Sequence, residues 1–196
     1  MTQAAFILLA YLLGSISFGI LVSRAFGLPD PRTVGSGNPG ATNVLRSGKK
    51  LPAILTLLGD AAKGWLAVFL AQHYGLQDGT ICLVGLAAFI GHLYPIFYGF
   101  KGGKGVATAL GVLLAFSGWL GLSLLIVWAV TFTIWRYSSL AALIAAGSAP
   151  IVAWFLLPYK GYAGTALILA LLLVWRHKSN IQKLLSGSES GFGKKK

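Results

Sequence analysis

Long apolar runs separated by short polar stretches constrain this chain more than any other feature of its sequence. A helix needs about 20 mostly apolar residues to cross the roughly 30 Å of hydrocarbon in a bilayer. The apolar runs cover residues 4–26, 51–74, 80–98, 106–135, 138–157 and 162–175. A soluble fold of 196 residues could not bury so much apolar surface, because 56% of the residues are hydrophobic and only 10% are charged. The runs therefore predict an all-α integral membrane protein, with residues 1–196 as a single membrane domain.

The fourth run is too long for one ordinary span. Its 30 residues would form a helix of about 45 Å at a rise of about 1.5 Å per residue. Ser117 and Gly118 lie near its middle, so we predict a short helix over 106–116 and a normal one over 119–135. We expect the preceding residues 101–105 to line a polar cavity, because irregular backbone at membrane depth is tolerated only away from lipid.

The distribution of basic residues decides between six spans and seven. Lys and Arg collect in the cytoplasmic loops of membrane proteins. With seven spans and the N-terminus outside, fourteen of the sixteen basic residues lie inside, Lys160 lies outside and Lys63 lies within the membrane. With six spans the division is eight inside and seven outside. We therefore predict seven transmembrane helices, one of them short, with the N-terminus outside and the C-terminus in the cytoplasm.

Composition narrows the classes of partner and cofactor. A net charge of +12 would suggest nucleic-acid binding in a soluble protein, but cytoplasmic loops explain it here, so no nucleic acid is expected. Cys82 is the only cysteine, which excludes an internal disulfide and a cysteine-based metal site. The chain starts without the basic stretch of a cleavable signal peptide, so the first run is expected to be retained. The low-complexity end, residues 190–196, is expected to be a disordered tail.

The first unusual segment is a glycine-rich loop over residues 34–46. Three of its glycines match the dinucleotide-binding G-x-G-x-x-G spacing, namely Gly35, Gly37 and Gly40. That fingerprint requires a soluble βαβ unit, which this chain lacks. Glycines still allow backbone N–H groups to converge on an anion, and four side chains can add donors: Ser36, Thr42, Asn43 and Arg46. The loop therefore favours a phosphate site, with an ordinary turn between spans as the alternative.

The second segment covers residues 91–108 and carries two lysines among glycines. Lys101 and Lys104 come just before a predicted helix start, where free backbone N–H groups favour anions. The segment resembles a P-loop, but the G-x-x-x-x-G-K-[ST] pattern would need Gly at 98 and Ser or Thr at 105, where this chain has Tyr98 and Gly105. A second anion site is indicated, and the alternative is that the lysines only set the topology.

The third segment follows the last run and covers residues 176–189. An amphipathic helix on the membrane surface would explain its basic residues. His177, Asn180 and Glu189 are hydrogen-bonding groups that attraction to lipid headgroups does not need. These three residues are therefore candidates for function.

An acidic and a basic residue lie inside the second run. Asp60 and Lys63 are three residues apart, so they share a helix face and can pair. Ionisable residues at membrane depth indicate a functional site by default, and a neutralised structural pair explains them equally well.

The three loop motifs together resemble the PlsY family of acyl-phosphate:glycerol-3-phosphate acyltransferases. The resemblance rests on GSGNPGATNVLR at 35–46, on GHLYPIF at 91–97 with FKGGKGVAT at 100–108, and on RHxxNIxxLxxGxE at 176–189. It implies transfer of a fatty acyl group from acyl phosphate to the 1-hydroxyl of sn-glycerol 3-phosphate, which gives lysophosphatidic acid for phospholipid synthesis. It also implies the bacterial inner (plasma) membrane, an active site facing the cytoplasm, and no metal or organic cofactor.

The resemblance and the residue chemistry together give two groups of site residues. The catalytic group is Ser36, Arg46, Lys104, His177 and Asn180. The substrate-binding group is Gly35, Gly37, Asn38, Gly40, Thr42, Asn43, Lys101, Gly102, Gly103, Gly105 and Glu189. The expected partners are acyl phosphate, glycerol 3-phosphate and membrane lipids, with no obligatory protein partner.

The chemistry of an acyl phosphate limits the mechanism. It is a mixed anhydride with a good leaving group, so the reaction needs positioning and charge stabilisation more than a protein nucleophile. Cys82 lies inside a predicted span, and no Ser-His-Asp order is evident. We therefore expect direct transfer without a covalent acyl-enzyme. The base is left open between His177 and the phosphate of glycerol 3-phosphate, whose second pKa is about 6.

Two other classes of function fit part of the sequence. A transporter or channel for an anionic solute also has spans, broken helices and cationic glycine loops. It needs access from both faces, however, whereas the unusual polar residues here fall on one predicted side. A purely structural membrane role explains the hydrophobicity but not three donor-rich loops.

Overall fold

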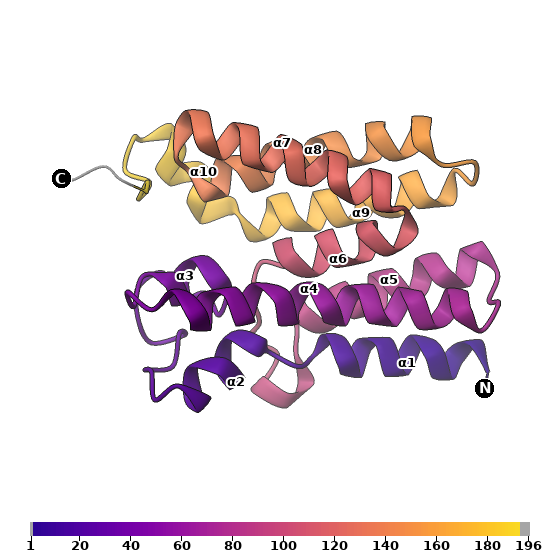
Figure 1. The fold of residues 1–196 in the computed structure, drawn as a ribbon, viewed down its shortest axis with the longest axis horizontal. Coiled ribbons are helices and arrows are strands. Elements are labelled where there is room, and N and C mark those ends of the chain that lie inside the picture. Colours follow the sequence, from indigo (N-terminus) through magenta and orange to yellow (C-terminus); the bar gives the residue numbers. More distant parts are fainter. Residues whose placement is uncertain (1, 193–196) are drawn as a thin grey trace. The chain divides into compact units, whose positions relative to one another are not determined.

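The computed structural model describes residues 2–192, and every regular element in that range is a helix (Figure 1). The elements are α1 (Gln3–Gly14), α2 (Phe18–Ala25), α3 (Ala41–Leu45), α4 (Lys50–His73), α5 (Asp78–Leu93), η1 (Ile96–Tyr98, a 3₁₀ turn), α6 (Val106–Phe116), α7 (Gly118–Trp135), α8 (Ser138–Leu156), α9 (Gly161–Arg176) and α10 (Lys178–Leu185). The prediction of an all-α chain is confirmed.

Four stretches of the described chain are long and apolar enough to cross a membrane. They are Lys50–His73, Asp78–Tyr98, Gly118–Trp135 and Ser138–Leu156. The helices α1 and α2 would add a fifth span if the pair, which is bent by 42°, crosses as one. The apolar helices α6 and α9 are shorter. Several spans are therefore present, while the count of seven and the orientation stay predictions.

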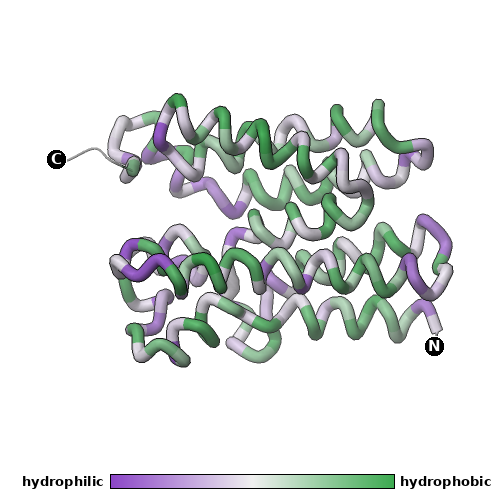
Figure 2. The backbone as a smooth tube through the Cα atoms, in the orientation of Figure 1, coloured by the Kyte–Doolittle hydropathy of each residue, from purple (hydrophilic) through white to green (hydrophobic). Residues whose placement is uncertain are grey.

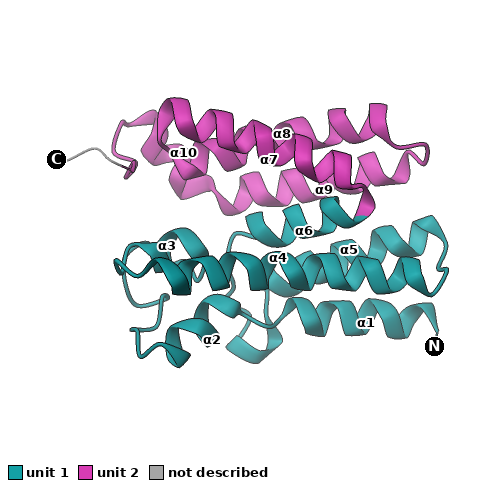
Figure 3. Cartoon of the chain, in the orientation of Figure 1, with its two compact units in different colours: residues 1–115 teal, residues 116–196 magenta. Residues whose placement is uncertain are grey.

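The chain divides into two compact units, residues 1–115 and residues 116–196 (Figure 3). Unit 1 holds α1 to α5, η1 and nearly all of α6, and unit 2 holds α7 to α10. Within each unit, hydrophobic residues follow the helices along most of their length (Figure 2). The expectation of one membrane domain stays a prediction.

Glycines allow α1 and α5 of unit 1 to pack closely. A side chain at Gly14 would overlap the backbone carbonyl of Ala88, and one at Gly91 would overlap that of Tyr11. Lipid tails are as apolar as the helix surfaces, so membrane helices associate through close backbone packing at small residues. This pairing fixes the end of α5, from which the second glycine loop starts.

The first apolar run is interrupted between α1 and α2. Ser15 caps the end of α1, and its hydroxyl donates to the Tyr11 carbonyl at 2.9 Å. Ser17 precedes α2, and the Ile16 carbonyl between them accepts a hydrogen bond from Lys63 Nζ at 2.6 Å. The break turns α2 away from α1, and the chain runs from α2 into the first glycine loop.

The predicted division of the long fourth run is confirmed. The helix α6 ends at Phe116, and Ser117 is the N-cap of α7, where its hydroxyl accepts from the Leu120 N–H at 3.4 Å. Serine is favoured at this position because its side-chain oxygen satisfies one of the free N–H groups of a helix start.

Residues near the C-terminus pack against the junction of α7 and α8 in unit 2. The Phe192 N–H donates to the Arg136 carbonyl at 2.9 Å, and the Phe192 ring lies 5.5 Å from that of Phe132. The tail predicted over 190–196 falls partly outside the described residues, which end at Phe192.

Candidate functional site

Asn43 organises the first glycine loop from the short helix α3. Its side chain is buried, and Oδ1 accepts from the Ser36 N–H at 2.9 Å. Its Nδ2 donates to the carbonyls of Pro31 at 2.8 Å and Val34 at 3.0 Å. One amide group therefore holds three points of the loop backbone. Asn43, which the sequence predicted to bind substrate, supports the loop through these contacts.

Two glycines of this loop adopt the left-handed conformation that favours glycine. The φ angles are +60° at Gly35 and +70° at Gly37. A side chain at Gly35 would also overlap Asn43 Oδ1. The glycines are therefore needed for the loop to wrap around Asn43, and the Ser36 side chain between them is exposed.

The other end of the loop begins α3. Gly40 is the N-cap residue of α3, and a side chain there would meet the Asn38 amide. Arg46, directly after α3, is exposed, and Thr42 is half-buried within it. The loop is held against α2, because Gly19 leaves room for the Pro39 carbonyl.

Arg32, just before this loop, forms a local salt bridge with Asp30 and also lies near the Tyr98 ring of the second motif. Arg32 Nη2 donates to Asp30 Oδ2 at 2.7 Å and Nε donates to Oδ1 at 3.0 Å. This hydrogen bonding is the main cause that lowers the pKa of Asp30 below its ordinary value of 3.8. The Arg32 guanidinium also lies 5.9 Å from the centroid of the Tyr98 ring. We did not predict Asp30 or Arg32 as site residues, although their spacing of two suits a local ion pair.

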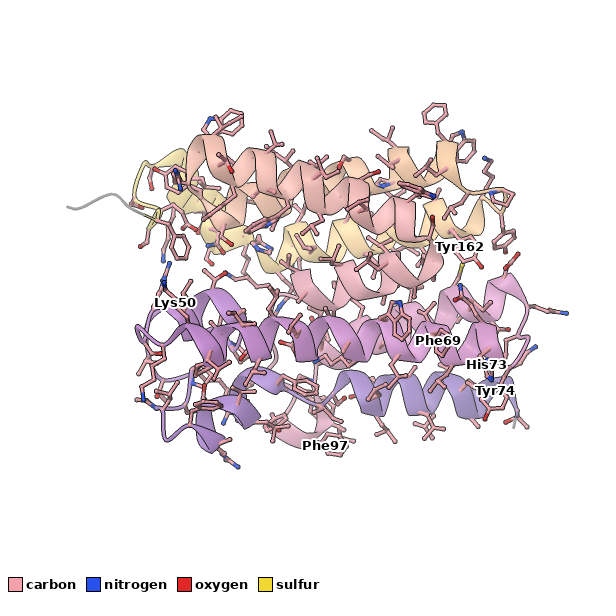
Figure 4. The ribbon with its side chains drawn as sticks, viewed as in Figure 1. Lys50, Phe69, His73, Tyr74, Phe97 and Tyr162 are labelled. Carbon is pink, nitrogen blue, oxygen red and sulfur yellow. The ribbon has the colours of Figure 1, made fainter. Side chains whose placement is uncertain are left out.

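The second motif leaves α5 through a tight turn beside the break between α1 and α2 (Figure 1). The Tyr11 hydroxyl donates to the Tyr94 carbonyl at 2.9 Å, and the Ile96 N–H reaches Ser15 Oγ at 3.4 Å. Phe97 of η1, labelled in Figure 4, is exposed. Phe100 then takes a φ of +60°, which is uncommon for a bulky residue.

The glycines of the second loop lie against the end of α5. The Gly103 N–H donates to the His92 carbonyl at 3.2 Å. A side chain at Gly103 would overlap the His92 ring, and one at Gly102 would overlap the His92 carbonyl. Gly105, with a φ of +84°, packs on the Phe89 ring. The loop backbone therefore lies directly on α5.

The two lysines of this loop differ in exposure. Lys101 is exposed and Lys104 is half-buried. Both lie in unit 1, as do Ser36 and Arg46 of the first loop. Unit 1 therefore holds the cationic residues of both glycine loops, and Arg32 with Tyr98 links the two.

The third motif forms a cluster of its own in unit 2. His177 joins α9 to α10 and is buried, and its Nδ1 lies 2.8 Å from the Leu173 carbonyl. A carbonyl only accepts, so we assign the proton of neutral His177 to Nδ1, which leaves Nε2 as an acceptor.

Glu189 holds Asn180 in the same cluster. Its Oε1 accepts from Asn180 Nδ2 at 2.7 Å and from Ser139 Oγ at 2.5 Å. Glu189, which we predicted to bind substrate, therefore orients Asn180. Ser139 was missed because it lies 50 residues away along the chain, in α8. Among the residues that the structure describes, no group of three or more His, Cys, Asp or Glu could hold a metal ion.

Comparison with known proteins gives consistent matches over nearly the full chain. The family model described as glycerol-3-phosphate acyltransferase matches residues 4–187. A glycerol-3-phosphate acyltransferase of Methylobacillus flagellatus is 70% identical over 195 residues, with 100% of each chain covered. One of Ralstonia nicotianae is 60% identical, with 97% of this chain and 94% of the relative covered.

Two solved structures have the same fold. Both are of PlsY (YgiH), an integral membrane glycerol 3-phosphate acyltransferase. The glycerol 3-phosphate form has a TM-score of 0.93 and 41% identity, and covers 97% of this chain and 96% of its own. The lysophosphatidic acid form has a TM-score of 0.91 and 39% identity, and covers 97% and 95%.

Proposed function

The chain belongs to the PlsY family of glycerol-3-phosphate acyltransferases, and we propose that it transfers a fatty acyl group from acyl phosphate to the 1-hydroxyl of sn-glycerol 3-phosphate. It is an acyltransferase and a multi-pass integral membrane protein. The acceptor and the lysophosphatidic acid product are those named for its structural relatives. The names of these relatives do not include the acyl donor, and acyl phosphate is proposed for that role from the residues of the glycine loops.

The observation that carries this proposal is the pair of glycine loops in unit 1 with their cationic and hydroxyl side chains. Ser36, Arg46 and Lys101 are exposed, and Lys104, in the same loop as Lys101, is half-buried. Both proposed substrates carry phosphate groups, which such loops bind through backbone N–H groups and cations. Acyl-CoA and acyl carrier protein present a thioester at the acyl carbon, whereas acyl phosphate presents a phosphate group there. Two cationic glycine loops, one for each phosphate, therefore favour acyl phosphate as the donor.

The reaction needs no covalent enzyme intermediate. The glycerol hydroxyl oxygen attacks the acyl carbon, and the bond from that carbon to the phosphate oxygen breaks to release inorganic phosphate. Negative charge develops on the acyl oxygen and on the leaving phosphate, where Ser36, Arg46 and Lys104 are proposed to stabilise it. Positioning of the two substrates supplies the remaining acceleration.

His177 is proposed as the group that accepts the hydroxyl proton. Its contact with the Leu173 carbonyl favours the tautomer in which Nε2 carries a lone pair. Asn180 is proposed to orient the glycerol hydroxyl, with Glu189 holding its amide. If the phosphate of glycerol 3-phosphate is the base instead, His177→Ala will keep near-normal kcat.

A donor assay tests the proposed activity. Purified protein in detergent is incubated with labelled glycerol 3-phosphate and, in turn, acyl phosphate, acyl-CoA and acyl carrier protein. We expect lysophosphatidic acid only from acyl phosphate. Product formed directly from either thioester would refute the donor assignment, and a covalent acyl-enzyme captured by mass spectrometry would refute direct transfer.

We also propose seven spans, with the glycine loops facing the cytoplasm of a bacterial inner membrane. The helix boundaries support the count of seven, because the apolar runs form the bent pair of α1 and α2 and then six single helices, namely α4, α5, α6, α7, α8 and α9. Labelling with a membrane-impermeant maleimide tests the topology in intact cells after Cys82→Ser. Tyr159→Cys should react from outside and Lys49→Cys should not, and the reverse pattern would overturn the orientation.

A further inference from the structure

A buried polar cluster lies among α4, α5 and α6 of unit 1, apart from the residues assigned to the reaction. It consists of Asp60, Lys63, His92 and Thr108, which are 2%, 2%, 7% and 0% exposed. Lys63 Nζ lies 2.8 Å from Asp60 Oδ1, so the pairing predicted from their spacing is confirmed. His92 and Thr108 join the pair from two other helices.

The hydrogen bonds of the cluster fix the orientation of the His92 ring. The Thr108 hydroxyl donates its only proton to the Asp60 carbonyl at 2.9 Å. Its oxygen can therefore only accept from His92 Nδ1, which lies 3.2 Å away. Asp60 Oδ1 lies 3.6 Å from the same nitrogen. With Nδ1 held from this side, the Nε2 edge of the ring faces Gly103.

The cluster contacts the second glycine loop directly, and it contacts the chain just before α2, the helix that precedes the first loop. On one side, His92 meets the second loop through its ring, packed on Gly103, and through its carbonyl, which accepts the Gly103 N–H. On the other side, Lys63 donates to the Ile16 carbonyl in the break before α2. The chain continues from α2 into the first loop, so the cluster holds the second loop directly and the start of the helix that leads to the first.

Stability alone does not account for a buried ion pair at this place. Removing two charges from water is costly, and well-packed apolar residues of the same volume are often as stable or more stable. Among the described residues, Asp60 Oδ1 has no hydrogen bond of good geometry, although Lys63 Nζ is within ion-pair distance. Ionisable groups inside a membrane helix bundle mark function by default.

We propose that Asp60, Lys63, His92 and Thr108 are positioning residues for glycerol 3-phosphate. They hold the His92 ring against Gly103, and the ring holds residues 101–105 in the arrangement that receives the acceptor phosphate. This inference rests on the proposed phosphate-binding function of that loop. The four residues themselves act through the loop.

Two threonines provide a matched test. Thr108 and Thr56 are both fully buried, and each hydroxyl donates to a backbone carbonyl. Thr56 bonds only within α4, to Pro52, whereas Thr108 connects three helices. Thr108→Val is expected to raise KM for glycerol 3-phosphate about tenfold, the effect of one buried hydrogen bond, with kcat and the donor KM changed less than about twofold. Thr56→Val is expected to leave all three constants within about twofold.

Several outcomes would overturn the inference. Equal changes in both variants, or a lower unfolding temperature of Thr108→Val with an unchanged KM, would make the cluster purely structural. If Thr108→Val does not fold, His92→Asn replaces it, because an asparagine amide can still donate to Thr108 but does not reach Gly103. The same rise in KM is expected, and an unchanged KM in this variant is a refutation.

A binding measurement separates this inference from the proposed donor. Calorimetric titration of glycerol 3-phosphate without any donor should show about tenfold weaker binding to Thr108→Val than to Thr56→Val. Failure of acyl phosphate as a donor would leave this comparison intact. Equal affinities would refute the positioning role even if the donor assignment holds.

Discussion

Replacing Asn43 with aspartate changes one buried atom and should disable the first glycine loop. The two side chains have the same shape, and one carboxylate oxygen can still accept from the Ser36 N–H. The other oxygen replaces Nδ2 and faces the carbonyls of Pro31 and Val34, which now lie 2.8 and 3.0 Å from that nitrogen. Two hydrogen bonds become two repulsive contacts.

The structure sets the size of the effect. Each lost hydrogen bond contributes about 1 kcal/mol, so the organised loop is disfavoured by about 2 kcal/mol before repulsion is counted. At about 1.4 kcal/mol per factor of ten, kcat/KM for glycerol 3-phosphate should fall at least roughly 30-fold. Asn43→Ala removes all three hydrogen bonds of the amide without adding a charge, so by the same count it should also lower kcat/KM.

The assay compares kcat/KM and the detergent unfolding temperature of these variants with those of Val34→Asp. Val34 is exposed in the same loop, so its variant adds the same charge and leaves the Asn43 amide in place. If Val34→Asp loses as much activity as Asn43→Asp, the charge is responsible and the structural role of Asn43 is refuted.

Three further predictions concern other parts of the chain. Glu189→Ala should lower kcat about tenfold, whereas Glu189→Gln, which keeps an oxygen to accept from Asn180, should lose less; equal losses in a steady-state assay would contradict this. Asp30→Asn should cost less than about 1 kcal/mol at neutral pH, because its ion pair with Arg32 is partly exposed. The hydrogen bond from Arg32 lowers the pKa of Asp30, so the difference in unfolding free energy between the two proteins is present above pH 3.8. It should vanish as the pH falls through the lowered pKa, and unfolding curves between neutral pH and the acid range check this. Gly14→Val should destabilise the protein by about 1–3 kcal/mol through overlap with a backbone carbonyl of α5, and an unchanged unfolding temperature would count against that packing.

The sequence could predict the helices because their signals are local. The apolar runs coincide with helices. Ser117 divides the fourth run at the predicted place, because a serine hydroxyl accepts a hydrogen bond from a free N–H group at a helix start. The pairing of Asp60 with Lys63 followed from a spacing of three on one helix. In each case a short window of residues carries the whole signal.

Other features depend on partners that no local window contains. The break between α1 and α2 lies in a continuous apolar run. The Ile16 carbonyl in this break accepts a hydrogen bond from Lys63, which is 47 residues away in the sequence. Asn43 and Glu189 were predicted to bind substrate, Asn43 as a donor in the first glycine loop and Glu189 from the family resemblance of the third motif, and that role stays a prediction. Their observed partners, loop carbonyls for Asn43 and Ser139 for Glu189, could only be found in three dimensions.

Long-range polar contacts have a particular weight in a membrane protein. The surface of a membrane helix that faces lipid is as apolar as the surface that faces another helix, so hydrophobicity alone does not fix which faces meet. In unit 1, hydrogen bonds join residues 47, 48 and 83 positions apart: Lys63 to Ile16, Thr108 to Asp60, and Tyr11 to Tyr94. The bond to Ile16 ends at the break between α1 and α2, the bond to Tyr94 ends just after α5, and Thr108 lies in the first turn of α6, just after the second loop. The buried polar groups of unit 1 therefore help to place the segments that lead into its two cationic loops, and substitutions of these groups should change the proposed binding of phosphate.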